Sequence, residues 1–84
     1  MMLIMSKEYY KKRLIDLRAS IAKEREAKKK DNVYYADMIK RTSSISSKAS
    51  YRKSKISRAA SHDRRIESLK RDIENVRATM RRIK

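Results

Sequence analysis

Apolar residues recur along the chain at the alternating three- and four-residue spacing of a helix that buries one narrow stripe. In the N-terminal half, the positions with this spacing are Tyr10, Leu14, Leu17 and Ile21, followed after a polar interval by Tyr35 and Met38. In the C-terminal half, the positions are Ile66, Leu69, Ile73, Val76, Met80 and Ile83. We call these twelve positions the seam. A seam with heptad spacing is typical of coiled coils, so it predicts two long helices.

The polar interval of the N-terminal stripe keeps the same register through Glu24, Lys28 and Asp31. Ile15 and Ala22 lie beside the stripe and are expected to widen it. The seam is strongest at the two ends of the chain. We therefore expect the two helices to pair antiparallel as an all-α, coiled-coil helical hairpin.

The chain contains no glycine and no proline, the residues that normally provide tight turns and helix ends. The weakest helix-forming stretch is rich in serine, because serine side chains compete for the backbone hydrogen bonds of a helix interior. We therefore expect one domain with an apolar N-terminal extension at 1–5, a helix at 6–42, a turn region at 43–48 and a helix at 49–83. The serines from 43 to 61 themselves keep heptad spacing, so a turn of only a few residues is equally consistent with the sequence.

A turn centred near Ser47 would place Leu17 opposite Val76 and Glu24 near Lys70. Two helices that share one narrow seam bury little apolar surface, which is marginal for a chain of 84 residues. We therefore expect a homodimer that forms a four-helix bundle, or a hetero-complex in which another protein covers the open side.

Charge is distributed unevenly along the chain. The protein has 25 lysine and arginine residues against 10 acidic ones, a net charge of +15. The basic segment, residues 41–62, contains no acid at all. Such a field attracts an acidic protein surface, or the phosphate backbone of a nucleic acid through counterion release. The candidate contact residues for either partner are Arg41, Lys48, Tyr51, Arg52, Lys53, Lys55, Arg58, Arg64 and Arg65.

Candidate chemistry is sparse. There is no cysteine, and His62 is the single histidine, so no common zinc or iron ligand set is expected. His62 falls on the extended seam, which predicts a packed histidine more than a catalytic one. Ser50 and Lys53 have the spacing of a Ser-x-x-Lys acyl-transfer motif, but a segment this rich in serine and lysine produces it by chance. We expect neither enzymatic activity nor a cofactor, a metal or a small-molecule ligand.

The chain opens with Met-Met-Leu-Ile-Met at 1–5. Five apolar residues are fewer than a signal peptide requires and far fewer than the roughly twenty of a membrane-spanning helix. We therefore expect a cytoplasmic protein without a membrane span.

The stretch Thr-Ser-Ser-Ile-Ser-Ser-Lys-Ala-Ser-Tyr-Arg at 42–52, with Ile-Glu-Ser-Leu-Lys-Arg-Asp-Ile-Glu at 66–74, carries a resemblance to known families. It resembles the N-terminal helical hairpins that precede TIR-type domains in some bacterial defence proteins, and it is similar to small helical partners of type VII secretion. The Trp-x-Gly turn of the second family is absent. The resemblance implies a bacterial or phage origin and an accessory role in a conflict or secretion system.

These observations lead to three hypotheses of function. The leading one is a non-enzymatic, basic helical-hairpin protein that binds an acidic protein partner. The second is a nucleic-acid-binding protein without sequence preference that uses residues 41–65. The third is a small phage-encoded inhibitor of a defence complex.

Overall fold

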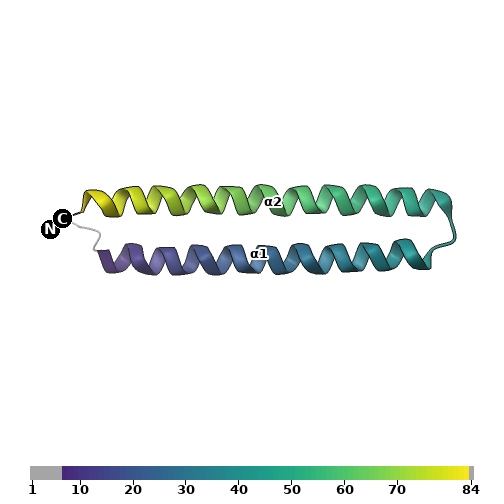
Figure 1. Ribbon diagram of the computed structural model, residues 1–84, viewed down its shortest axis with the longest axis horizontal. Helices are drawn as coiled ribbons and strands as arrows, with labels where there is room; N and C mark the ends of the chain where they lie inside the picture. Colours follow the sequence, from purple (N-terminus) through teal and green to yellow (C-terminus); the bar gives the residue numbers. More distant parts are fainter. Residues whose placement is uncertain (1–6, 84) are drawn as a thin grey trace.

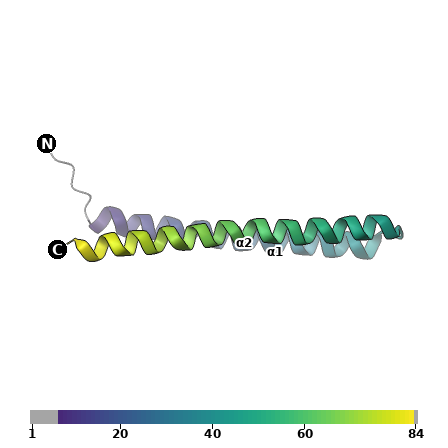
Figure 2. The same cartoon turned by 90° about the horizontal axis from the view of Figure 1, so that it is seen from above.

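The structure is a computed structural model that describes residues 7–83. It contains α1 (Lys7–Arg41) and α2 (Ile45–Arg82), which lie side by side and antiparallel (Figure 1). At 1.5 Å per residue, the 38 residues of α2 form a rod about 57 Å long. Seen from above, the two helices cross at a shallow angle (Figure 2), as in left-handed coiled-coil packing. The predicted all-α helical hairpin is confirmed.

The core is a single line of side chains between the helices. The buried side chains are Leu14, Leu17, Ile21, His62 and Ile66, and Leu17 is the least exposed of them at 3%. The other positions of the seam are half-buried: Tyr10, Tyr35, Met38, Leu69, Ile73, Val76, Met80 and Ile83. No side chain in the described part of the chain is completely enclosed. Two helices cover the seam from two directions only, so its flanks stay open to solvent.

Two apolar positions beside the N-terminal stripe are not part of this core. Ile15 is 64% exposed, and Ala22 is also exposed. The expectation that they widen the seam is wrong, because a single facing helix covers a stripe too narrow to include them.

The turn is shorter than the predicted region 43–48. Only Thr42, Ser43 and Ser44 lie between the helices, so α2 begins at Ile45, four residues before the expected start. Ser44 is the N-cap of α2: its backbone is extended, and its Oγ accepts a hydrogen bond of 3.3 Å from the Ser47 amide. Serine is a poor residue inside a helix but a strong one at its N-cap. One capping serine therefore allows the serine-rich residues after it to be helical.

The other predicted boundaries differ by little, or lie outside the described residues. α1 ends at Arg41, and the amide of Thr42 still donates to the carbonyl of Met38 at 3.1 Å. α2 ends at Arg82, and its C-cap Ile83 donates its amide proton to the carbonyl of Met80 at 3.2 Å. The predicted extension at 1–5 lies outside residues 7–83, as does the expected start of the first helix at residue 6.

The short turn also changes which residues face each other. With the turn centred on Ser43, each residue of α1 meets a residue of α2 that is several positions earlier than predicted. The expected pairing of Glu24 with Lys70 is wrong: Glu24 contacts His62 and Arg65. Lys70 instead forms an ion pair of 3.7 Å with Glu67 of its own helix.

Candidate functional site

The middle of the rod holds a histidine between two carboxylates, which we call the histidine clamp (Glu24, Asp31 and His62). Glu24 and Asp31 are seven residues apart on α1, and therefore project from the same side of the helix. The Nδ1 atom of His62 lies 3.3 Å from Oε2 of Glu24, and its Nε2 atom lies 2.7 Å from Oδ2 of Asp31. A histidine ring can donate from both nitrogens only when it is protonated. The clamp therefore favours the imidazolium form.

The electrostatics of the clamp follow from these contacts. The hydrogen bond to Asp31 raises the pKa of His62, the contact with Glu24 raises it further, and burial opposes both. Glu24 also accepts a hydrogen bond of 3.0 Å from Nη1 of Arg65. This bond is the largest cause of the lowered pKa of Glu24, and the hydrogen bond with His62 contributes in the same direction. The polar interval of the seam is thus filled by charged groups of opposite sign.

A second ion pair between the helices lies next to the clamp. The Nζ atom of Lys28 is 2.7 Å from Oδ1 of Asp63, and both side chains are partly exposed. Together with the bond between Glu24 and Arg65, it connects the two helices near their midpoints. These contacts stabilise one alignment of the two helices. Within residues 7–83, no group of three or more histidine, aspartate or glutamate side chains is arranged to hold a metal ion.

The sequence contains the elements of the clamp but not their pairing. Its spacing places Glu24 and Asp31 on the N-terminal stripe and His62 on the extended seam. The missing information was the length of the turn, which decides which part of α1 faces His62. Two carboxylates seven residues apart in an apolar stripe are the signal that could have predicted a buried cationic side chain on the facing helix.

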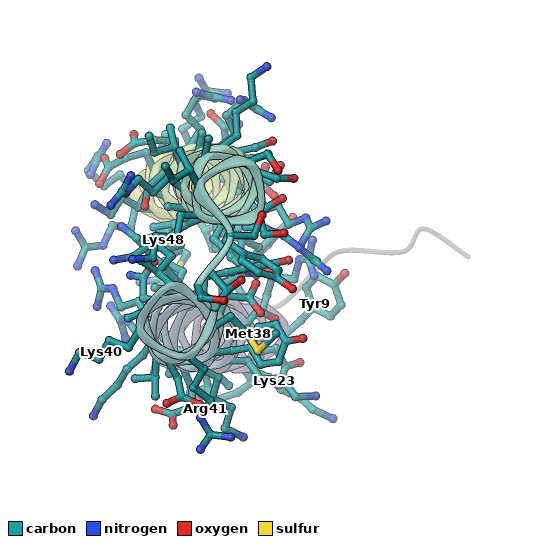
Figure 3. All side chains as sticks on the ribbon, turned by 90° about the vertical axis from the view of Figure 1, so that its right-hand side faces the viewer. Tyr9, Lys23, Met38, Lys40, Arg41 and Lys48 are labelled. Atoms are coloured by element: carbon teal, nitrogen blue, oxygen red, sulfur yellow. The ribbon has the colours of Figure 1, made fainter. Side chains whose placement is uncertain are left out.

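The candidate contact residues lie mostly in the half of the rod that ends at the turn. Those that are exposed are Arg41, Arg52, Lys53, Arg58, Arg64 and Arg65, whereas Lys48, Tyr51 and Lys55 are half-buried. Viewed along the rod from the turn, Lys40 and Arg41 extend outward from α1, and Lys48 lies at the side between the levels of the two helices (Figure 3). Arg64 and Arg65 lie closer to the middle, and Arg65 is engaged by Glu24.

The acids of α1 nearest this half are already paired within the protein. Asp31 binds His62, and Asp37 forms an ion pair of 3.1 Å with Arg41 at the end of α1. In the part of the chain that the structure describes, no ion pair involves Lys48, Arg52, Lys53 or Lys55. Their positive charge is therefore open to a partner.

Three tyrosines form a cluster on one side of this half. The Tyr34 and Tyr35 rings meet edge to face with centroids 5.1 Å apart, and the Tyr35 and Tyr51 rings are 6.4 Å apart across the two helices. Arg58 lies beside this cluster, where it shares a surface hollow with Tyr35, and its interaction with Tyr35 is the largest cause of its raised pKa. Tyr34 is 56% exposed, whereas Tyr35 and Tyr51 are half-buried. Only Tyr34 presents a largely open ring.

An apolar groove runs between the helices in the same half of the rod. The residues that line it are Asn32, Ile39, Arg52, Lys55, Ile56 and Ala59. Ile56 is 71% exposed, and Ile45, closer to the turn, is 85% exposed. Sequence reasoning missed this groove because Ile45 and Ile56 fall outside the seam. Their spacing of eleven residues, which is three helical turns, was the available signal.

Comparison of the chain with protein-family models, curated proteins and solved structures gave no significant match. Neither α1 nor α2 contains an apolar stretch long enough to cross a membrane.

Proposed function

We propose that the protein is a non-enzymatic helical-hairpin interaction protein, which binds an acidic protein partner through the basic segment 41–62. The observation that carries this proposal is the excess positive charge of the segment. It has six lysine and arginine residues and no acid, and Lys48, Arg52, Lys53 and Lys55 make no ion pair within residues 7–83. The neighbouring acids Asp31 and Asp37 are occupied by His62 and Arg41. A partner with carboxylates on its surface would supply the missing opposite charge.

Incomplete burial of the seam supports a role in assembly. An apolar line whose flanks remain open gains stability when a further helix or a second hairpin covers it. A homodimer that forms a four-helix bundle is one such arrangement. A complex with an acidic partner is favoured over it, because two copies would bring two net charges of +15 together.

The proposal is tested with two polyanions of different chemistry. Poly-L-glutamate represents an acidic protein, and a single-stranded oligonucleotide represents a nucleic acid. Binding is measured at 0.1 M and 0.5 M salt for the wild type and for the triple variant Arg52→Gln/Lys53→Gln/Lys55→Gln. We expect the wild type to bind poly-L-glutamate at the lower salt, and the triple variant to bind it at least about tenfold more weakly.

A matched control removes the same charge elsewhere. The triple variant Lys7→Gln/Lys12→Gln/Arg18→Gln changes three exposed residues at the opposite end of the rod. It should keep most of the affinity for poly-L-glutamate. Equal losses in the two triple variants would mean that net charge, and not the basic segment, drives binding.

Nucleic-acid binding is the second candidate, and the tyrosine cluster is the observation that favours it. The exposed Tyr34 ring belongs to the cluster beside which Arg58 lies, and a base stacked on such a ring gains about 1–3 kcal/mol. Phosphate contacts would make affinity fall steeply with salt. Neutralising Arg52, Lys53 and Lys55 should then flatten that dependence. Co-elution with nucleic acid that is lost only in high salt would place this function first.

A further inference from the structure

The apolar groove lies in the half of the rod that ends at the turn, beside exposed isoleucines of α2. Ile39 of α1 and Ala59 of α2 are half-buried at its sides, while Ile56 is largely exposed. Ile45 lies eleven residues before Ile56 and therefore projects from nearly the same side of α2. The stretch from Ile45 to Ala59 is about 21 Å long at 1.5 Å per residue. An amphipathic helix of four turns would cover this length with its apolar face.

The charge of the groove indicates what kind of helix it accepts. Arg52 and Lys55 are part of its lining, and no acid is. The nearest acid along α2 toward the middle of the rod is Asp63, which is paired with Lys28. Acidic residues beside the apolar stripe of a bound helix would therefore meet Arg52 and Lys55 without competition from within the protein. A second copy placed on the same surface would bring these two cations against their own counterparts.

We propose that this groove, lined by Ile39, Ile56, Ala59, Arg52 and Lys55, is the docking site for an acidic amphipathic helix of a partner protein. The bound helix would complete a three-helix arrangement in the turn-proximal half of the rod. This inference rests on the proposed function and specifies it: the partner is helical, its apolar face fills the groove, and its carboxylates flank that face.

A synthetic helix provides the probe. The acidic peptide has three heptads, with leucine at positions a and d and glutamate at e and g. The basic peptide has lysine in place of each glutamate. Binding of each labelled peptide is measured by fluorescence anisotropy. We expect the acidic peptide to bind the wild type, the basic peptide to bind at least about tenfold more weakly, and Ile56→Ser to weaken binding of the acidic peptide by at least about tenfold.

The control for this substitution is Ile15→Ser. Ile15 is 64% exposed, similar to Ile56 at 71%, but it lies on α1 in the half of the rod away from the turn. Both substitutions change an exposed isoleucine, so both variants should keep the helical circular dichroism spectrum of the wild type. Ile15→Ser should bind the acidic peptide within twofold of the wild type. Ile45→Ser provides a second variant of the groove side, with an expected weakening in the same direction.

The outcomes separate this inference from the function on which it rests. If Ile56→Ser and Ile45→Ser bind the acidic peptide as tightly as the wild type does, the groove is not the site, although binding of poly-L-glutamate still supports the proposed function. If the wild type binds neither the acidic peptide nor poly-L-glutamate, the proposed function itself is wrong. If the wild type dimerises and Ile56→Ser is a monomer, the groove is an interface between two copies, and the inference of an acidic partner helix is overturned.

Discussion

The Nε2 atom of His62 on α2 lies 2.7 Å from Oδ2 of Asp31 on α1, at a point where the apolar seam is interrupted. Apolar side chains repeated every heptad can pair in more than one alignment, since a slide of seven residues again brings apolar residues together. A slide of the same size would remove His62 from between Glu24 and Asp31. The contacts of the histidine clamp therefore form in the observed alignment and would be lost in one shifted by a heptad, as for buried polar groups in other coiled coils.

The clamp predicts a dependence of stability on pH. The folded-state pKa of His62 is raised above 6.5, so its contribution to the free energy of unfolding is complete below pH 6.5 and is lost as pH rises through the raised value. The pKa of Glu24 is lowered from 4.5, so its contribution is complete above pH 4.5 and is lost as pH falls through the lowered value. We expect the thermal midpoint, followed by circular dichroism, to be highest between these two pH values and to fall toward pH 9.

The control for the alkaline side of this profile is His62→Gln, which has no titratable ring. We expect this variant to be less stable than the wild type at pH 6 and to lose little further stability between pH 6 and pH 9. Parallel profiles for the two proteins over that range would show that groups other than His62 cause the pH dependence.

Leu17 is the most deeply buried residue between 7 and 83, and its truncation tests the seam directly. Leu17→Ala removes apolar contacts between the helices, and such core truncations cost about 2–5 kcal/mol. A hairpin with so thin a core has little reserve, so we expect a large loss of the helical signal and a lower urea midpoint. Ile15→Ala makes a comparable deletion at an exposed position of the same helix. It should change stability by less than about 0.5 kcal/mol, and equal effects of the two substitutions would contradict the assignment of the core.

Substitution by alanine should affect stability differently at two adjacent serines of the turn. Ser44 accepts the amide proton of Ser47 and caps α2, so Ser44→Ala should cost about 1 kcal/mol. In a domain of this size, that loss lowers the thermal midpoint by roughly 4–8 °C. Ser43 is exposed in the turn and makes no such capping bond, so Ser43→Ala should shift the midpoint by much less. A larger shift for Ser43→Ala would show that the N-cap lies one residue earlier.

The hairpin could be predicted from the sequence because its causes are local. The absence of glycine and proline removes most signals for turns, and the heptad spacing of the seam identifies the buried side of each helix. The position of the turn could not be predicted in the same way. Serine weakens a helix interior and also caps a helix start, so several serines between 43 and 50 offered the same signal.

The candidate site depended on that turn. The partner of Glu24 changes from Lys70 to His62 and Arg65 when the turn moves toward Ser43. A difference of a few residues in the loop is therefore enough to hide the histidine clamp from an analysis of spacing. The groove at Ile56 depends in addition on how the two helices cross, which heptad spacing does not specify. The positive charge of the basic segment needed no such information, because it follows from the order of residues along the chain.

The ion pair between Lys28 and Asp63 can be used to measure how much a polar contact between the two helices contributes to the free energy of unfolding. The two side chains are 33% and 56% exposed, so water screens their attraction despite the distance of 2.7 Å. A double-mutant cycle with Lys28→Gln and Asp63→Asn should give a coupling free energy of about 0.2–1 kcal/mol at low salt. The value should shrink in 0.5 M salt.

The matched cycle uses Lys70→Gln and Glu67→Gln, a more exposed pair 3.7 Å apart on α2. Its coupling should be smaller, because both partners belong to one helix and neither links the two helices. If the Lys28–Asp63 coupling exceeds about 1 kcal/mol and persists in high salt, the pair is shielded from water in solution. A third helix or a second copy covering this side of the rod would provide that shielding. The cycle should then be repeated at increasing protein concentration, where self-association would raise the coupling and a monomeric protein would leave it unchanged.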